Sequence, residues 1–439
     1  FKTRPNEFSP TMKYRILNSG GVRCSLVAVV LSLSLRAAQP VAPTDKATPS
    51  NSEYPHPVKN PNSSVMLKGD WVPKDTHQID FERLPRIPTQ HTVVVDVRNK
   101  GWTESSKVNT EKGGEAQHNY LIHHDGAFWV MWSEGPGIEA RVGCLVRYAT
   151  SADGLNWSEP KFLTGFPPNS GPDSPHYNTR TLKGMRYMAR GFWVREGKLL
   201  ALVSLDESAG FFGPSLQLLA WEWDPTKRRW NAAGVVQKNA INNFPPQKLP
   251  SGEWGVSQRT FDYMKTGSRF LIGGVKGLDQ WESVPVVHGD DVLKPEEPHW
   301  WTLPDGNIVA FFRDNAASHY VFRSFSTDSG RTWTKPVKTN FPDARSKFYG
   351  LRLSDGRYAF VSNPKPGIRD VMTVSLSDDG MVFNKMFYLV GGRTIDYPHM
   401  MEHNGFLYIT HNNGKRGVEV HRVRIRDLNT LEMPASISR

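Results

Sequence analysis

Asp305-Gly306-Asn307-Ile308-Val309-Ala310-Phe311-Phe312-Arg313 combines a tight turn ending in Gly with an apolar strand that finishes on a polar residue. The same pattern recurs five more times, at Asp125-Gly126, Glu196-Gly197, Ser251-Gly252, Asp355-Gly356 and Asn404-Gly405. Along the chain, the six glycines are separated by 71, 55, 54, 50 and 49 residues. A strand-rich unit repeated at this spacing is typical of a propeller. The repeats therefore predict an all-β fold, a six-bladed β-propeller with one pocket on its axis.

Three segments share a second pattern, in which Ser and Asp precede a Gly and an aromatic residue. Residues 326–333 read Ser-x-Asp-x-Gly-x-x-Trp, and residues 151–157 and 377–383 are versions shorter by one residue. In such a hairpin the Ser and Asp side chains accept hydrogen bonds from turn amides, and the aromatic ring packs between sheets. Residues 221–230 form a degenerate fourth version. We expect these Asp-box hairpins to be structural elements on the outer strands.

The N-terminal residues differ in composition from the repeats. Residues 12–15 begin a basic segment, residues 24–35 are apolar, and small residues follow up to position 42. This is the layout of a cleaved secretory signal peptide, and the apolar run is too short for a membrane span. We therefore expect a secreted or periplasmic protein. Its expected divisions are 1–38 (upstream residues and signal peptide), 39–80 (flexible linker), 81–430 (propeller) and 431–439 (C-terminal tail).

Charge and cysteine content narrow the function classes. The chain has a net charge of +11, but residues 1–46 hold seven basic and two acidic groups, which leaves +6 for the remainder. Such a mild surplus suits an acidic glycan better than a nucleic acid. Cys24 lies in the signal segment, so Cys144 has no internal disulfide partner, and we expect it to be a buried, inert thiol. We expect a monomer with neither a metal nor another cofactor.

A polar residue stands seven positions after each repeat glycine, where a propeller strand approaches one mouth of the axial channel. These residues are Ser133, Ser204, Arg259, Arg313, Asn363 and Asn412. Polar atoms at these positions are what a ligand-binding funnel requires, although strands can also end on polar residues without a ligand. His411, beside the last of these positions, is a further pocket candidate.

These repeats and hairpins resemble those of the sialidase superfamily of six-bladed propellers, roughly over residues 110–425. Glu297, followed by a Leu-x-Asp-Gly turn and Arg313, is similar to a family segment in which Glu activates a tyrosine and Arg binds a carboxylate. Arg369, ahead of an Asp-box strand, is similar to the last arginine of the family's triad. Tyr397 stands at the distance expected of the nucleophilic tyrosine. The resemblance implies that Arg313 and Arg369 bind the carboxylate of the substrate. Arg259, one of the strand-end residues, is a further substrate-binding candidate.

The implied chemistry suits an acidic sugar. A carboxylate on the anomeric carbon repels an anionic nucleophile, whereas a neutral tyrosine that loses its proton to a glutamate as it attacks avoids this repulsion. The planar guanidinium of arginine holds a carboxylate through two hydrogen bonds. We therefore expect an exo-acting glycoside hydrolase that removes a terminal acidic sugar, sialic acid or a relative of it, from glycans.

The first blade departs from the family pattern. Arg86 begins an Arg-Ile-Pro segment like the one whose arginine completes the triad, but it lies 40 residues before Gly126. His118 stands where that arginine is expected, so either residue is a candidate for the first-blade position.

The acid/base aspartate of the family has no counterpart at its expected place. The candidates in its stead are Glu139, then Glu134, then Asp173. His118 can also transfer protons near neutral pH. Two other functions remain open: a non-catalytic glycan-binding propeller, and a hydrolase or lyase of uronate-containing polysaccharides that uses His118.

Overall fold

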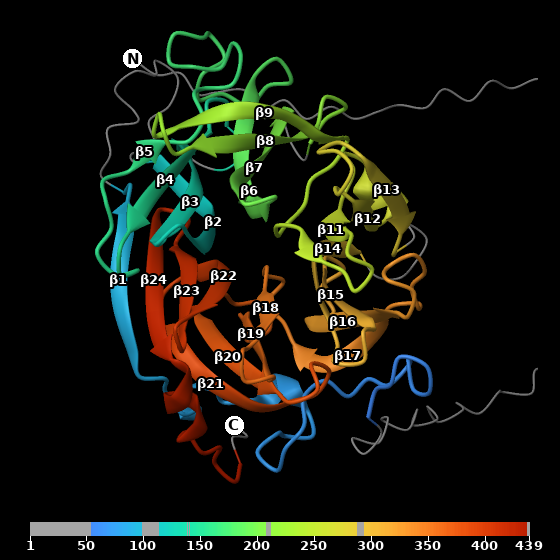
Figure 1. The fold of residues 1–439 in the computed structure, drawn as a ribbon. Helices are drawn as coiled ribbons and strands as arrows, with labels where there is room; N and C mark the ends of the chain where they lie inside the picture. The colour runs from blue at the N-terminus through green and yellow to red at the C-terminus, as the bar shows by residue number, and fades with distance from the viewer. Residues whose placement is uncertain are drawn as a thin grey trace, which may run out of the picture. The chain divides into compact units, whose positions relative to one another are not determined.

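Six four-stranded sheets stand around a common axis in the computed structural model (Figure 1). The structure describes residues 54–98, 114–137, 139, 141–207, 212–287 and 294–436, all within the compact unit Pro49–Arg439. The expected signal peptide, and the expected linker up to residue 53, lie outside the described residues. Named strands that are neighbours in a sheet pair antiparallel, and the six-bladed propeller predicted from the repeats is confirmed.

Blades 1 to 3 follow one another along the chain. Blade 1 contains β2 (Gly114–His124), β3 (Ala127–Pro136), β4 (Leu145–Ser151) and β5 (Lys161–Phe162). Blade 2 contains β6 (Met185–Arg195), β7 (Lys198–Glu207), β8 (Gln217–Asp224) and β9 (Arg229–Lys238). Blade 3 contains β10 (Gln247–Lys248), β11 (Trp254–Gln258), β12 (Arg269–Gly273) and β13 (Trp281–Pro285), with the one-turn helix α1 (Tyr263–Thr266) between β11 and β12.

Blades 4 to 6 complete the ring. Blade 4 contains β14 (Pro295–Thr302), β15 (Ile308–Asp314), β16 (Tyr320–Ser326) and β17 (Val337–Pro342). Blade 5 contains β18 (Tyr349–Arg352), β19 (Tyr358–Ser362), β20 (Val371–Ser377) and β21 (Phe383–Gly391). Blade 6 contains β22 (Ile395–His403), β23 (Phe406–Asn413), β24 (Gly417–Arg424) and β1 (Thr89–Asp96).

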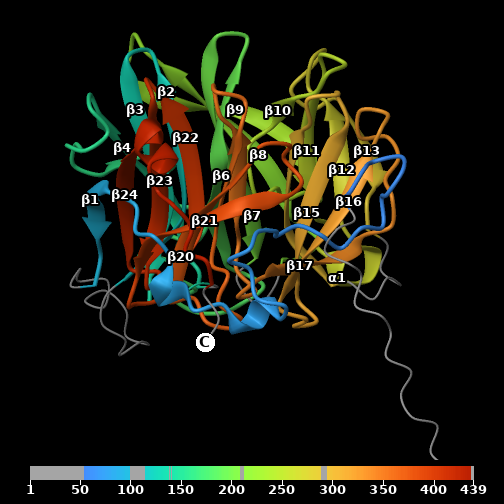
Figure 2. The same cartoon turned by 90° about the horizontal axis from the view of Figure 1, so that it is seen from below.

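Strand β1 closes the ring. It comes from the N-terminal side of the chain and pairs with β24 as the outer strand of the last blade, so the two ends of the propeller are joined in one sheet (Figure 1). The strands β2, β6, β14, β18 and β22 lie nearest the axis, and in side view the strands run roughly along it (Figure 2). The described residues also form three short 3₁₀ turns: η1 (Thr76–Gln78), η2 (Phe81–Arg83) and η3 (Ile425–Asn429).

The six repeat glycines all lie in inner hairpin turns, which explains their spacing. Gly126, Gly197, Gly252, Gly306, Gly356 and Gly405 have φ values between 73° and 95°. Residues with a Cβ rarely adopt this left-handed region, so each turn favours glycine. One glycine per blade is therefore the sequence mark of one hairpin per blade.

The Asp-boxes lie between the third and fourth strands of blades 1, 4 and 5, on the outer side of the ring as expected. In blade 4, Ser326 Oγ accepts a hydrogen bond from the Gly330 amide at 2.8 Å, and the Trp333 indole packs edge-on against Phe270 of blade 3. The degenerate copy in blade 2 keeps part of the design, because Asp224 Oδ1 accepts from the amides of Thr226 and Lys227 at 3.0 Å. Each hairpin thus fixes its turn with side-chain oxygens.

The segment before β1 corrects our expectation of a flexible linker over residues 39–80. Its described part crosses the outer edges of blades 4 and 5 (Figure 2), and Met66, Leu67 and Trp71 are buried there. Asn340 Oδ1 of blade 4 accepts hydrogen bonds from the Met66 and Leu67 amides at 2.8 and 2.9 Å. The Pro- and Ser-rich composition ends near residue 64, and the apolar side chains that follow it are buried against the propeller.

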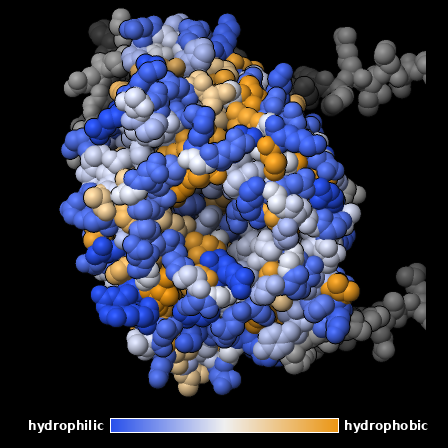
Figure 3. Space-filling view, viewed as in Figure 1, coloured by the Kyte–Doolittle hydropathy of each residue, from blue (hydrophilic) through white to orange (hydrophobic). Residues whose placement is uncertain are grey.

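The surface and the core fit a propeller with an apolar interior. Hydrophilic residues cover most of the face shown in Figure 3, with small hydrophobic areas among them. Aromatic and aliphatic side chains fill the spaces between neighbouring blades. Cys144 is buried, as expected. Within the described residues, no helix has the length and apolar character needed to cross a membrane.

Candidate active site

A cavity of about 540 Å³ opens on the axis of the propeller, and residues from all six blades line it. Among the described residues that line it, eight side chains are basic and two are acidic: Arg180, Arg186, Arg190, Arg259, Arg313, Arg345, Arg369 and Lys415, against Glu139 and Glu297. Such an excess of fixed positive charge in a walled cavity attracts anions. The cavity is therefore suited to a ligand with at least one acidic group.

Three of the lining side chains occupy the same structural position in different blades. His118 on β2, Glu297 on β14 and Tyr397 on β22 each lie in a β-bulge of an inner strand. Their φ values are 54°, 49° and 56°, in the left-handed region that residues with a Cβ rarely adopt. A bulge re-aims a side chain out of the strand's regular alternation, and strained backbone of this kind gathers at functional sites.

Tyr397 is surrounded by cations. The Arg369 guanidinium carbon lies 5.6 Å from the centre of its ring, and the amino groups of Lys347 and Lys415 lie 5.4 and 5.2 Å from it. The His118 ring stacks on the Tyr397 ring at a centroid distance of 5.0 Å. Burial, with the nearby Glu297 and Glu139, raises the pKa of Tyr397 to about 12. The phenol is therefore protonated and neutral near pH 7.

Glu297 is buried beside Arg313. The Arg313 Nη1 donates to Glu297 Oε2 at 2.5 Å, and the two other nitrogens of that guanidinium donate to Asn315 Oδ1. Burial raises the pKa of Glu297, but the positive charges of Arg313 and Lys347 outweigh it and bring the pKa to about 2. Glu297 is therefore an ionised carboxylate that can accept a proton.

Arg369 is anchored from two sides. Its Nη1 donates to the buried Asp396 at 2.8 Å, and its Nη2 donates to the backbone carbonyl of Arg345. Arg345 is itself a lining residue with a φ of 57°. Arg313 and Arg369 thus line one cavity with Tyr397 and Glu297, as the spacing of these residues suggested.

Glu139 links His118 to Lys415. Its carboxylate lies 3.5 Å from His118 Nε2 and 2.8 Å from Lys415 Nζ. Burial raises the pKa of Glu139, but the hydrogen bonds and charges of its two partners outweigh it and hold that pKa well below its usual range. Burial lowers the pKa of His118 to about 3. Near pH 7, then, the carboxylate is charged and the imidazole is neutral.

The structure resolves which first-blade candidate reaches the cavity. His118 lines it, whereas Arg86 lies on the outside of blade 5, paired with Glu82 and stacked on the Tyr388 ring at 4.0 Å. Arg86 therefore does not reach the axis, and it does not complete the triad.

Several other candidates lie outside the cavity. Glu134 is buried in β3, where it accepts a hydrogen bond from the Trp132 indole at 2.9 Å. Asp173 is exposed on the connection between blades 1 and 2. His411 is buried within blade 6, with its Nε2 3.1 Å from that of His421. Its side chain lies on the face of the blade that also carries its strand partner Glu419, and it does not line the cavity.

Of the polar residues seven positions after the repeat glycines, Arg259 and Arg313 line the cavity. The others are buried and bond neighbouring strands together. Ser133 Oγ accepts from the Ala189 amide at 2.8 Å, and Asn363 Nδ2 donates to the carbonyls of Val371 and Ile395. In four of the six blades, therefore, the polar residue at this position stabilises the fold beside the cavity and does not line the cavity.

Sequence reasoning missed several basic residues of this site, although the repeat contained a signal for some of them. Counting back seven to nine positions from the repeat glycines reaches the inner strand of a blade or the residues just before it. The residues found in this way include His118, Arg190, Glu297, Lys347 and Tyr397. Counting seven positions forward instead reaches the second strand of a blade or the residue after it.

Lys347 does not line the cavity but lies close to Tyr397, and we assigned it no role from the sequence. It is buried, and its Nζ donates to Tyr120 Oη at 2.9 Å. Burial lowers the pKa of this amino group to about 7, although Glu297 raises it. A buried lysine near the nucleophile candidate therefore adds to the positive field around it.

Comparison with known proteins agrees with the repeats. Residues 193–409 match the family described as BNR repeat-like domain. The match extends from the end of β6 in blade 2 to β23 in blade 6. Together with the fold, this match is consistent with a divergent member of the sialidase superfamily. No curated protein sequence matches the chain.

Solved structures with the same fold as this chain include a protein of unknown function and several sialidases. The first, from Dyadobacter fermentans, is 14% identical with a TM-score of 0.58, and the alignment covers 78% of this chain and 100% of that one. The Trypanosoma rangeli sialidase in complex with sialic acid is 13% identical, with a TM-score of 0.55 and coverages of 79% and 60%. The NanB sialidase from Streptococcus pneumoniae is 12% identical with a TM-score of 0.57, and the alignment covers 77% of this chain and 71% of that one.

The sialidase chains are longer than the matched region. The alignment spans 60% of the Trypanosoma rangeli chain, and 35% of a further sialidase that is 20% identical with a TM-score of 0.56. At these identities the likeness establishes the fold alone.

Proposed function

We propose that the chain is an exo-acting glycoside hydrolase that removes a terminal acidic sugar, sialic acid or a related sugar, from glycans. The observation that carries this proposal is the neutral, buried Tyr397 in a cavity with eight basic side chains and an ionised Glu297. A two-carboxylate glycosidase would instead present a pair of acids at the reacting carbon. The sialidase fold of the neighbours, one of them solved with sialic acid, supports the same substrate class.

In the first step, Tyr397 Oη attacks the anomeric carbon and its proton passes to Glu297, while the bond to the leaving glycosidic oxygen breaks and that oxygen takes up a proton. A water then attacks the same carbon and gives a proton to the Glu139 carboxylate, while the bond to the tyrosine breaks and the phenol regains its proton from Glu297. The neutral phenol approaches the substrate carboxylate without charge repulsion. The surrounding cations stabilise the anionic substrate and the phenolate character that develops during attack.

Because Glu297 is paired with Arg313, substrate binding to Arg313 would also make Glu297 a stronger base. Arg313 bonds Glu297 in the ligand-free chain. A substrate carboxylate that takes the guanidinium for itself removes the charge that keeps the pKa of Glu297 at about 2. Glu297 then becomes a stronger base at the moment when Tyr397 must lose its proton.

Glu139 is our proposed proton carrier for the leaving oxygen, with His118 holding it in place. As with Arg313 and Glu297, a substrate can compete for the cation that pairs with this carboxylate. Lys415 pairs with Glu139 in the ligand-free chain and also lies 5.2 Å from the Tyr397 ring. When an anionic ligand attracts Lys415, the pKa of Glu139 rises toward its usual range and the carboxyl group can carry a proton.

The test is hydrolysis of sialic acid and uronic acid glycosides by the wild type and by Tyr397→Phe. We expect a loss of turnover of at least about 100-fold, since the variant has no nucleophilic oxygen. Tyr408→Phe is the matched control, because Tyr408 lies outside the cavity and its Oη makes one long contact, 3.5 Å, with the Asp153 carbonyl. Undiminished activity of Tyr397→Phe would contradict the proposal.

A second candidate function follows from His118 in place of the first-blade arginine. A hydrolase or lyase of uronate-containing polysaccharides could use this histidine, and the eight basic side chains suit a polyanion. A lyase produces an unsaturated uronate whose ultraviolet absorbance rises during the reaction, whereas a hydrolase produces none. Tight glycan binding without any turnover would instead favour a non-catalytic binding propeller.

A further inference from the structure

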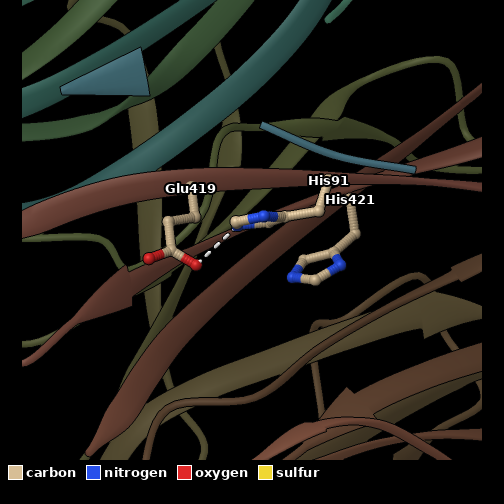
Figure 4. Close-up of side chains that lie close together, drawn as sticks. All are labelled: His91, Glu419 and His421. Atoms are coloured by element: carbon tan, nitrogen blue, oxygen red, sulfur yellow. Dashed lines mark hydrogen bonds and ion pairs between the residues drawn. The ribbon is translucent and has the colours of Figure 1, made fainter. Parts of the chain in front are cut away.

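Four potential metal ligands gather in blade 6, where the ring closes. The donor atoms of His91, Glu419 and His421 all lie within 4.8 Å of one another (Figure 4), and His411 adjoins them with its Nε2 3.1 Å from that of His421. None of these four residues lines the axial cavity. The cluster is therefore separate from the candidate active site.

The strand register explains why these side chains share one face of the sheet. Glu419 and His421 are two residues apart on β24, so they point to the same side. His91 of β1 is paired with His421, and His411 of β23 is paired with Glu419. Three adjacent strands thus present three imidazoles and one carboxylate to one point.

The spacing of the donor atoms approaches that of a tetrahedral site. Bonds of about 2.0–2.1 Å to zinc place neighbouring donors about 3.3–3.4 Å apart. In this structure His91 Nε2 lies 2.8 Å from Glu419 Oε2, which lies 3.9 Å from His411 Nε2. Together with the 3.1 Å between His411 and His421, these distances bracket the required value. His411 lies outside the set of three whose donors are all within 4.8 Å of one another, so its ring must turn toward His91 for all four donors to surround one ion.

Hydrogen bonds behind the donors hold the rings in a binding orientation. His411 Nδ1 lies 3.0 Å from the Asn412 carbonyl, which only accepts, so Nδ1 carries the proton and Nε2 presents its lone pair to the cluster. His421 Nδ1 lies 3.3 Å from Thr89 Oγ1, and Asn413 Nδ2 donates to Glu419 Oε1 at 2.6 Å. Partners of this kind orient metal-bound imidazoles and carboxylates.

Metal binding at this cluster depends on access from solvent and on displacement of a cation that already bonds Glu419. The His91 side chain is 38% exposed, so an ion can enter from solvent on that side. The Arg393 guanidinium bonds Glu419 Oε2, and its side chain is 40% exposed. An incoming ion must displace this guanidinium, which can move into solvent.

We propose that His91, His411, Glu419 and His421 form a site for a divalent transition metal ion, zinc in the first instance. The site is a clasp: it joins β1 to β24 and β23, and β1 is the strand through which the N-terminal part of the propeller closes the ring. Imidazole and carboxylate donors in tetrahedral array are those that zinc prefers. Binding stabilises the closed ring, because an ion held by the native strands favours the folded state.

The experiment titrates Zn²⁺ alone into full-length, chelator-treated protein by calorimetry, with Co²⁺ absorption as a second readout of tetrahedral coordination. We expect one ion per chain and a rise in melting temperature on binding. His91→Ala should weaken binding at least tenfold, and this partly exposed side chain can be removed without emptying the core. Arg393→Gln should tighten binding, because it removes the competing cation.

His403→Ala is the matched control, since His403 stacks on His123 at 3.7 Å elsewhere on the same blade and could bind metal adventitiously. Zinc affinity should survive this change. The clasp is refuted if no zinc binds, if His91→Ala binds as tightly as the wild type, or if His403→Ala removes the binding instead.

Discussion

The candidate site depends on residues that the backbone holds in an uncommon conformation. His118, Glu297 and Tyr397 have positive φ in equivalent bulges, and so do the lining residues Arg345 and Lys415 outside the strands. A non-glycine residue costs about 1–2 kcal/mol there. Five such residues around one cavity indicate that the fold gives up stability to aim these side chains at the axis.

Glu297→Gln tests the proposed base at the residue scale. The amide keeps the shape of the side chain and can still accept from Arg313, but it cannot take the proton of Tyr397. We expect kcat on an acidic glycoside to fall by about 10²–10⁴-fold, the usual contribution of a general base, with a smaller change in KM. A parallel Glu282→Gln change, at an exposed glutamate of β13, should leave kcat unaltered. A variant Glu297→Gln with wild-type kcat would remove this residue from the mechanism.

Buried histidines predict a specific pH dependence of stability. Burial lowers the pKa of His299 to about 3, although its hydrogen bond to the Gly350 carbonyl raises it. In the unfolded chain the pKa is about 6.5, so between these values the unfolded state binds the additional proton and acidification favours unfolding. His299→Gln lacks this contribution. The difference in unfolding free energy between wild type and variant should therefore shrink as the pH falls from about 6.5 to about 3.

Urea unfolding of both proteins across that pH range measures the difference. A constant gap between the two unfolding free energies would contradict the assignment of a neutral, buried His299.

At the scale of the single element, the sequence specified the hairpins better than the bulges. The Gly turns and the Asp-boxes have a residue-level cause, namely positive φ and side-chain bonds to turn amides, and both were identified in advance. The bulges of β2, β14 and β22 have no such mark, because their first residues are His118, Glu297 and Tyr397 rather than glycine. These three residues were found through the family resemblance, and Lys347 and Arg190 were not found at all.

Two glycine substitutions separate backbone strain from packing in these elements. Gly330→Ala in the Asp-box of blade 4 combines a φ of 90° with a Cβ that would lie 2.5 Å from the Phe270 ring, so we expect a loss of about 2–4 kcal/mol. Gly126→Ala has a φ of 73° and nothing within 4 Å of its Cβ, so only the backbone cost of about 1–2 kcal/mol applies. Thermal and urea unfolding give both values. Equal losses for the two variants would mean that the Asp-box glycine has no packing role.

At the scale of the whole molecule, the repeat spacing was sufficient to predict the propeller, but the ends of the chain were harder to interpret. The closing strand β1 and the segment that packs on blades 4 and 5 are single features without a repeat, so no periodic signal reveals them. Similarly, Arg86 matches a short family segment yet lies on the outside of the ring. In this chain a short family motif predicts a site residue only where its position fits the spacing of the repeats.

The measurement that tests the central claim most directly is covalent trapping of Tyr397. The protein is incubated with 2,3-difluorosialic acid, a compound that the Trypanosoma rangeli sialidase holds as a covalent intermediate, and is analysed by intact mass and peptide mapping. We predict one added sugar per chain, located on Tyr397 and absent from Tyr397→Phe. A sugar attached to another residue, or no adduct under conditions in which the chain cleaves sialic acid glycosides, would contradict the account.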